Sequence, residues 1–278
     1  MPDLNLRPVQ SSQTSSASSS KPIPAPSILK PWQFSYASSP DGKDLNLLIM
    51  FHGLGDTKEP FANLGRQLNL PSTAVLSLQA PDPIPLMETP CWSWYNTFTP
   101  LFEPLPNPNP STALPPLRAL LSTLTSPEIG WDLTQIHLFG FGQGGTIALE
   151  LALDIGKRPI PPAASSGGST HPTSLPGKRL GSVVSICAGL ISFPSSSLDL
   201  ETPVAMFTRV QAKSQVGQKM LSAVQRAFKH VEVVQAPGGG EAMPRGKDEW
   251  QGIMKFWGQV LAREETWKGE GEVYEVVK

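Results

Sequence analysis

A glycine-rich turn at residues 140–145 is the segment whose residue types and spacing could bring a ligand to reactive or polar groups. It reads Gly-Phe-Gly-Gln-Gly-Gly, follows the apolar run Ile136–Phe139 and precedes the helix-forming run Thr146–Leu151. A tight turn between a strand and a helix can present a nucleophilic serine in the pattern Gly-x-Ser-x-Gly. Position 142, where this serine would stand, is glycine. Glycine-rich turns also bring backbone close to dinucleotides and phosphates, so this elbow turn alone does not select a reaction.

A second motif, at residues 48–56, helps to decide between a nucleophile turn and a turn that binds a dinucleotide or phosphate. Its sequence is Leu-Ile-Met-Phe-His-Gly-Leu-Gly-Asp, an apolar run of strand length that enters a glycine-containing loop. Together with Gln79-Ala80-Pro81, Trp94-Tyr95 and the elbow turn, it resembles the acyl-protein thioesterase, phospholipase and carboxylesterase family over residues 44–263. The resemblance implies an α/β-hydrolase fold, with a mainly parallel central sheet and helices on both faces, and hydrolysis of carboxylic esters or thioesters.

The same resemblance implies a Ser-Asp-His triad in that chain order, and this sequence lacks all three residues. The family's serine corresponds to Gly142. The family's acid follows the strand that corresponds to Val204–Phe207. In this sequence the loop after that strand, residues 208–213, contains no carboxylate, and the equivalent position lies near Ala212. The family's Gly-His-x-Met-Pro segment aligns with Gly240–Pro244, which places Glu241 at the position of the base. The sequence therefore predicts little or no serine-hydrolase activity.

None of the histidines is placed to substitute for the missing base. They occupy the loop of the second motif, the interior of a strand, a Gly/Ser/Pro-rich insertion and the residue before the last strand: His52, His137, His171 and His230. A carboxylate in place of histidine is a poor base toward water at neutral pH unless burial raises its pKa. We therefore interpret Glu241 as an exposed loop residue.

The two cysteines are the remaining nucleophile candidates. Cys187 follows the strand-like run Leu180–Ile186, and Cys91 lies in a proline-rich segment. Because free cysteine is most often simply buried, and the end of that strand normally packs beside the site, we expect neither thiol at the elbow turn. Two cysteines are too few for a disulfide scaffold and show no zinc-ligand spacing. We expect no metal and no cofactor.

Backbone groups of the implied pocket remain although the triad is missing. The resemblance implies an oxyanion hole built from the amides of Leu54 and Gln143, and the helix that begins near Gln143 adds partial positive charge. We predict a pocket for an acyl or carboxylate small molecule with these residues around it: His52, Gly53, Trp92, Trp94 and Tyr95. The alternative is a vestigial pocket in which the aromatic residues only pack the cap.

Strand-like and helix-like segments alternate along the rest of the chain. Apolar runs with little polar alternation suit strands that are buried on both faces: Leu45–Phe51, Ala74–Leu78, Ile136–Phe139, Leu180–Ile186, Val204–Phe207 and Val231–Val234. Between them lie helix-like segments at Glu59–Leu68, Leu117–Leu124, Gly144–Ile155, Ser214–His230 and Lys247–Arg263. This alternation predicts an α/β protein with a mainly parallel sheet.

One large domain is expected, because 278 residues fit a single three-layer core. Residues 1–30 are rich in Ser and Pro and are predicted to form a disordered tail, so the hydrolase-like domain would span residues 31–278. Two excursions interrupt the alternation. The aromatic residues within the proline-rich segment 81–116 favour a cap over the sheet edge, and residues 158–178 are predicted to be a flexible insertion.

Charge and hydropathy exclude several classes of partner. Lys and Arg number 22 against 23 for Asp and Glu, so there is no basic surplus for nucleic acid or anionic lipid. No run approaches the roughly 20 apolar residues that a membrane span needs. The low cysteine content fits a reducing compartment. We therefore expect a cytoplasmic protein without a membrane span.

Three simultaneous losses favour an inactive or strongly impaired serine hydrolase that retains a pocket for a small ligand or a protein partner. The alternative is an active ester or thioester hydrolase that uses non-standard catalytic groups, since the oxyanion and elbow motifs are otherwise present. A third possibility, a structural subunit of a larger assembly, is suggested by the Ser- and Pro-rich segments, because such segments often bind partners on folding.

Overall fold

The computed structural model describes residues 20–263, apart from residues 86, 100, 102, 161–177 and 212–213. It also describes two short strands, β1 (Asn5–Pro8) and β11 (Tyr274–Val277), which pair antiparallel. Among the described residues, no helix is both long and apolar enough to cross a membrane.

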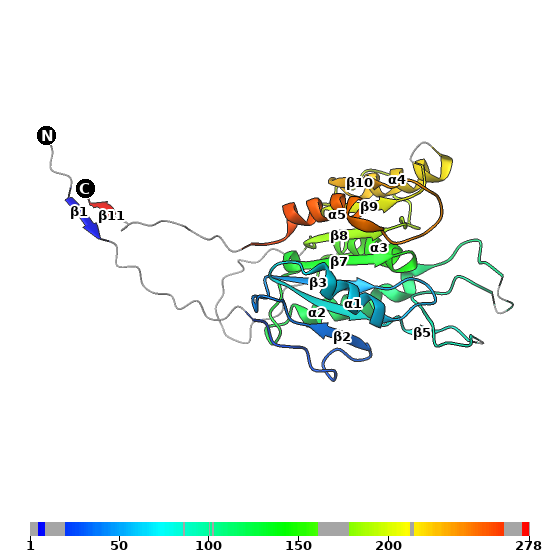
Figure 1. The fold of residues 1–278 in the computed structure, drawn as a ribbon, viewed down its shortest axis with the longest axis horizontal. Coiled ribbons are helices and arrows are strands. Elements are labelled where there is room, and N and C mark those ends of the chain that lie inside the picture. The colour runs from blue at the N-terminus through cyan, green and yellow to red at the C-terminus, as the bar shows by residue number, and fades with distance from the viewer. Residues whose placement is uncertain are drawn as a thin grey trace.

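A seven-stranded sheet forms the centre of the domain (Figure 1). Its strands lie in the order β10-β9-β8-β7-β3-β4-β2, and every neighbouring pair is parallel except β2 with β4. The predicted α/β class with a mainly parallel sheet is confirmed. The strand bounds are β2 Phe34–Ala37, β3 Asn46–Phe51, β4 Thr73–Leu78, β7 Ile136–Phe141, β8 Ser182–Ile186, β9 Val204–Thr208 and β10 Val231–Gln235.

Helices cover both faces of this sheet. Successive residues of β3 point to opposite faces, so Leu47 and Ile49 pack with α2, α3 and α4, whereas Leu48 and Met50 pack with α1 and α5. In Figure 1, α1 and α5 lie in front of the sheet. The helix bounds are α1 Lys58–Leu68, α2 Leu114–Leu124, α3 Gln143–Lys157, α4 Gln215–Ala227 and α5 Gly246–Val260.

Short elements complete the described part of the chain. The strands β5 (Asp82–Pro83) and β6 (Trp92–Ser93) pair antiparallel within the predicted cap. Two 3-10 helices, η1 (Pro110–Ala113) and η2 (Leu133–Gln135), precede α2 and β7. The backbone of the cap therefore bonds partly to itself, which fits a segment that folds against the domain.

The two edge strands differ from the sequence prediction. The prediction of a strand buried on both faces is wrong for β10, whose residues are half-buried or exposed. The reason is its place at the edge of the sheet, where it has one neighbour, β9. β2, at the other edge, is not predicted, because its residues are half-buried and include no apolar run. The inner strands β3, β4, β8 and β9 are fully buried, as predicted.

The N-terminal segment contacts the folded domain before the predicted boundary at residue 31. Leu29 is buried, and the backbone N–H of Lys21 donates to Oδ2 of Asp44 over 3.0 Å. Residues 20–30 therefore pack against the sheet domain, in contrast to the predicted disordered tail. The part of the tail before β1 and between β1 and residue 20 lies outside the described residues, as do residues 161–177 of the predicted flexible insertion.

The strand order brings two loops together at one edge of the sheet. From β3 the chain continues to β4 on one side, and it later enters β7 on the other side of β3. At such a reversal in an open parallel sheet, the loops at the carboxyl ends of the strands border a crevice where ligands bind. The loop after β3 begins at His52, and the elbow turn after β7 contains Gly142.

Candidate functional site

Gly142 forms the sharp bend between β7 and α3. Its φ is +51° and its ψ is −119°, a conformation that residues with side chains rarely adopt. Its N–H donates to the carbonyl of Ile186 over 2.9 Å, and its carbonyl accepts from the N–H of Thr146 over 3.1 Å. Because the bend is complete within one residue, α3 begins directly afterwards at Gln143.

Two further glycines let the elbow turn press against β3. A Cβ on Gly144 would lie 2.4 Å from the carbonyl oxygens of Phe51 and His52. A Cβ on Gly140 would lie 2.2 Å from the carbonyl oxygen of Gly144. Neither position can accept a side chain unless the backbone moves. These contacts set the position of the α3 N-terminus relative to the loop after β3.

His52 is a structural residue that orders the loop after β3. Its ring is buried, its Nδ1 lies 2.7 Å from the carbonyl oxygen of Gly53, and its Nε2 accepts from the N–H of Ala80 over 3.0 Å. These partners assign the proton to Nδ1. Burial lowers the pKa of His52 and keeps the ring neutral. His52 was predicted to line the pocket, but it is not among the residues of the cavity at the elbow turn, and both of its ring nitrogens contact other groups of the protein.

The side chain of Gln143 attaches the cap to the elbow turn. Its Oε1 accepts from the backbone N–H of Trp94 over 2.7 Å, and its Nε2 donates to the carbonyl of Tyr95 over 2.8 Å. The Trp94 indole N–H in turn donates to the carbonyl of His52 over 2.8 Å. The Trp-Tyr pair of the cap and the glutamine of the elbow turn, which are far apart in the sequence, thus form one hydrogen-bonded unit.

A cavity of about 620 Å³ opens at the elbow turn. Leu54, Gly142 and Gln143 lie on its wall, and most of the remaining wall is apolar, with residues such as Phe98, Leu105, Leu190 and Met220. Of the five predicted pocket residues, Tyr95 lies on this wall. The others are not among its residues: Trp94 is 1 % exposed and packs behind the site against Phe51 and His52.

Two residues of this wall, Leu54 and Gln143, have backbone amides without an acceptor in the described part of the chain. The N-terminus of α3 adds partial positive charge beside them. Such paired donors suit a carbonyl oxygen or another electron-rich ligand atom.

Glu241, which the sequence predicts at the position of the family's histidine, reaches the elbow turn. A Cβ built on Gly142 would lie 3.5 Å from Oε2 of Glu241. Glu241 is exposed, and no described residue forms a hydrogen bond or ion pair with its carboxylate. The two positions predicted for the family's nucleophile and base, Gly142 and Glu241, are therefore adjacent in space.

Cys187 lies on the same cavity wall, contrary to the expectation that it packs beside the site. Its φ of +53° bends the chain at the end of β8, and its N–H donates to the carbonyl of Phe207 over 2.8 Å. Its Sγ lies 3.4 Å from the carbonyl oxygen of Ala242. Burial raises the pKa of this thiol. Cys91, in the cap, is buried as expected.

A buried arginine holds the loop that carries Glu241. Arg209 donates to the carbonyls of Pro237 over 2.9 Å and Met243 over 3.2 Å, and it contacts both carboxylate oxygens of Glu249 over 2.9 and 2.5 Å. The guanidinium lowers the pKa of Glu249. Sequence reasoning missed Arg209 because its partner lies 40 residues away and neither belongs to a motif. The predicted acid position near Ala212 lies outside the described residues.

The other histidines lie away from the elbow turn or outside the described residues. His137 is buried near the start of β7, where Nδ1 lies 2.9 Å from Oγ of Ser182 and Nε2 lies 3.2 Å from Oδ1 of Asn46. Burial lowers its pKa to about 3. His230 is exposed, and His171 is not described. In the described ranges, no group of three or more His, Cys, Asp and Glu residues could hold a metal ion.

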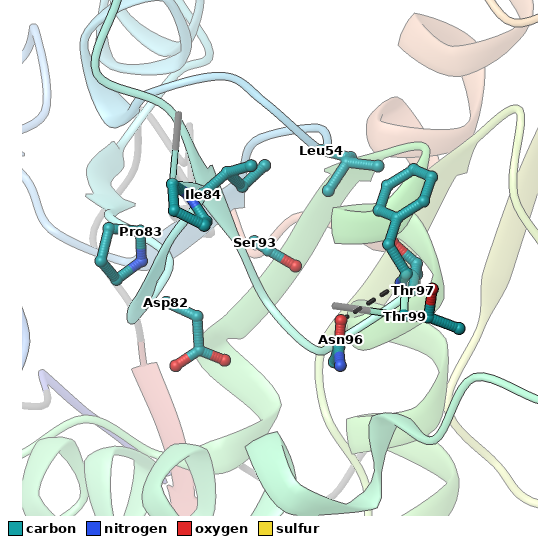
Figure 2. A pocket seen from close by; sticks show the side chains of 10 residues that line it. Leu54, Asp82, Pro83, Ile84, Ser93, Asn96, Thr97 and Thr99 are labelled. Atoms are coloured by element: carbon teal, nitrogen blue, oxygen red, sulfur yellow. Dashed lines mark hydrogen bonds between the residues drawn. The ribbon is translucent and has the colours of Figure 1, made fainter. Parts of the chain in front are cut away.

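A second cavity, of about 510 Å³, adjoins the first beneath the cap. Figure 2 shows Asp82 and Pro83 of β5 on one side of this hollow and Leu54 and Thr97 on the other. Leu54, Thr97 and Phe98 lie on the walls of both cavities. The two cavities therefore border each other at these three residues.

Sequence comparison agrees with this geometry. The profile of the phospholipase/carboxylesterase family matches residues 35–190. An uncharacterized hydrolase of Mycosarcoma maydis is 34 % identical over 278 residues, which cover 98 % of each chain.

Solved structures share the fold at low sequence identity. The esterase PE8 aligns with a TM-score of 0.62 at 17 % identity, and acyl-protein thioesterase 2 of Zea mays aligns with a TM-score of 0.58 at 18 % identity. Each alignment covers 83 % of this chain and 99 % of the solved one. At these identities the likeness shows a shared fold. From the profile match, the fungal relative and the geometry above, this chain belongs to the phospholipase/carboxylesterase family of α/β-hydrolases.

Proposed function

We propose that this protein binds a small acyl compound at the elbow turn and performs no serine-hydrolase chemistry. The observation that carries the proposal is Gly142, whose backbone makes the bend of a nucleophile turn, with φ +51° and ψ −119°, while the residue has no side chain. Glycine offers no atom that could attack a carbonyl carbon. An acyl-enzyme intermediate therefore cannot form at this position.

The base position supports the same conclusion. In a serine triad, an imidazole takes the proton from the nucleophile and later returns it to the leaving group. Glu241 stands in that place as an exposed carboxylate, 3.5 Å from where a Cβ on Gly142 would lie. There is no hydroxyl between the two residues from which a proton could be taken.

Binding remains compatible with the site because its donors belong to the backbone. Leu54 and Gln143 are residues of the wall of a cavity of about 620 Å³, and their N–H groups lack acceptors among the described residues. Ligand sites commonly combine a mainly apolar wall with a few polar groups, in volumes of roughly 300–1,000 Å³. A carbonyl oxygen at the two amides and an acyl chain along the apolar wall would use both features.

An activity assay with a restored nucleophile tests the proposal. Wild type, Gly142→Ser and Gly142→Ser with Glu241→His are compared on short acyl esters and thioesters, with heat-denatured wild type as the background. We expect wild type to match the background and to resist a serine-directed fluorophosphonate. We expect the double variant to react with that probe, although turnover stays low because residues 208–213 contain no carboxylate. Serine at φ +51° costs about 1–3 kcal/mol of stability, so folding is checked by circular dichroism.

Turnover by the wild type well above the denatured background would contradict the proposal. Cys187 makes this outcome worth resolving, because its thiol lies on the same wall as Gly142 and Glu241. The raised pKa of the thiol argues against it, since the thiolate is the nucleophilic form. Loss of any wild-type turnover in Cys187→Ser, and its retention in Cys91→Ser, would assign a cysteine hydrolase instead.

A further inference from the structure

The cavity at the elbow turn carries one formal charge on its described wall, the carboxylate of Glu241. No Lys, Arg or His among the described residues lies on that wall. The Tyr95 hydroxyl and the Cys187 thiol also lie there, and burial raises the pKa of both groups, to about 12 for Tyr95. The wall is therefore negative at Glu241 and otherwise neutral.

This charge is not neutralised by a described side chain. Arg209, in the adjoining loop, contacts Glu249 and two backbone carbonyls. Glu241 has no hydrogen bond or ion pair to any described residue, and its Oε2 would lie 3.5 Å from a Cβ on Gly142. A ligand above Gly142 would thus meet a carboxylate from the loop after β10 and amide donors from the loop after β3 and the start of α3.

We propose that this cavity selects ligands that combine a neutral acyl carbonyl with a cationic ammonium group, such as acyl derivatives of amino compounds. The carbonyl oxygen accepts from the N–H groups of Leu54 and Gln143, and the ammonium group lies at Glu241. This inference rests on the proposed binding function and names the ligand class for the same site.

The arrangement also distinguishes among acyl ligands. A carboxylate ligand could use the two amides, but its charge would be repelled by Glu241 at short range. The sequence prediction of an acyl or carboxylate ligand is thereby narrowed to the acyl one. The rings of Tyr95 and Phe98 lie on the same wall, and aromatic faces favour alkylammonium groups.

Three matched amides test the charge preference. Each carries a butanoyl group on nitrogen: one ends in a trimethylammonium group, one in the neutral tert-butyl group of the same shape, and one in a carboxylate. Amides are used because they resist hydrolysis, so that binding is measured alone by isothermal titration calorimetry. We expect the ammonium compound to bind about fivefold more tightly than the neutral one, as for a partly exposed charge pair, and the carboxylate to bind most weakly.

Three variants locate the effect. Glu241→Gln removes the charge with little change in shape and should abolish the preference for ammonium. Glu128→Gln removes a charge from an exposed residue in the turn after α2, outside this wall, and should leave the preference intact. Leu54→Trp adds bulk at an exposed wall residue while keeping its amide, and should weaken the binding of all three compounds.

The outcomes separate this inference from the proposed function. If all three compounds bind equally to the wild type and lose affinity in Leu54→Trp, the site binds acyl compounds but the charge preference is refuted. If the carboxylate binds most tightly, the ligand class is wrong. If none binds at millimolar concentration, the proposed binding function fails together with the inference.

Discussion

The elbow turn and the loop that carries Glu241 border the same cavity, but the two regions are constrained in different ways. At the elbow, a Cβ on Gly144 would lie 2.4 Å from backbone oxygens of the neighbouring strand end. In the loop after β10, a Cβ on Gly238, Gly239 or Gly240 would meet nothing within 4 Å. The first region is packed against the sheet, whereas the second extends into open space.

This difference bears on the proposal that the chain keeps the shape of a hydrolase site without its chemistry. The elbow turn lies in close contact with the backbone at the end of β3, so a side chain that blocks this contact affects stability. Gly142 and Glu241 border the cavity. The identity of the side chain at these two positions does not alter the close backbone contacts of Gly144. Catalytic groups can thus be absent while the turn, the amides and the cap remain in place.

The largest expected difference in stability between the two regions comes from replacing one glycine in each by alanine. Gly144→Ala should destabilise the protein by about 3 kcal/mol or more, because the added Cβ would overlap the carbonyl oxygens of Phe51 and His52. Gly239→Ala should change stability by less than about 1 kcal/mol. Urea unfolding of both variants gives the free energies. Similar values for the two would show that the packed and open regions do not differ as described.

A second effect should appear on acidification and arises in the strand that leads to the elbow. Burial lowers the pKa of His137 to about 3, below its value in the unfolded chain, so the unfolded state takes up the proton first. The stability contributed by the neutral His137 ring is therefore fully present above about pH 6.5 and is lost as the pH falls. The loss amounts to roughly 2 kcal/mol between pH 6.5 and 5. We compare this slope with that of His137→Asn, which should be flatter. His52 and other groups contribute to both slopes, and equal slopes would contradict the buried neutral state of His137.

The attachment of the cap to the elbow should give a smaller effect. Gln143→Ala leaves the N–H of Trp94 without its acceptor and removes one of two donors to the carbonyl of Tyr95, which Ser93 Oγ still reaches, and should cost about 1–1.5 kcal/mol. It should also speed proteolytic cleavage within residues 81–116. Gln67→Ala, at an exposed position in α1, is the matched control and should leave both measurements near wild type. Unchanged proteolysis in Gln143→Ala would show that the cap is held by other contacts.

The smallest effect is expected in the loop region, at the pair of Arg209 and Glu249. Glu249→Gln should lower the melting temperature modestly, because the pair also holds the carbonyls of Pro237 and Met243. The pKa of Glu249 is lowered in the folded state, so its contribution is present above the ordinary glutamate pKa and lost as the pH falls through the lowered value. The difference from wild type should therefore shrink in acid. Asp248→Asn, in the same helical turn, should show neither effect.

Local sequence was sufficient for the inner elements and for the elbow. The apolar runs of β3, β4, β8 and β9 indicate strands because burial on both faces leaves no polar alternation. The glycine spacing at 140–145, after a strand-like run and before a helix-forming run, indicates the turn. β2 was missed, and β10 was expected to be buried, because the position of a strand in a sheet is a property of its neighbours and not of its own residues.

The sequence by itself determined the α/β class and the glycine at position 142 of the elbow turn, and it led to the prediction that the family's serine, acid and histidine are missing. The tertiary structure alone decided that Glu241 faces Gly142, that Cys187 lies on the cavity wall, and that His52 and Trp94 support the site from behind. It also paired Arg209 with Glu249. These relations join residues of different loops, and the distances between loops are set by how the strands are ordered and packed, which no local pattern encodes.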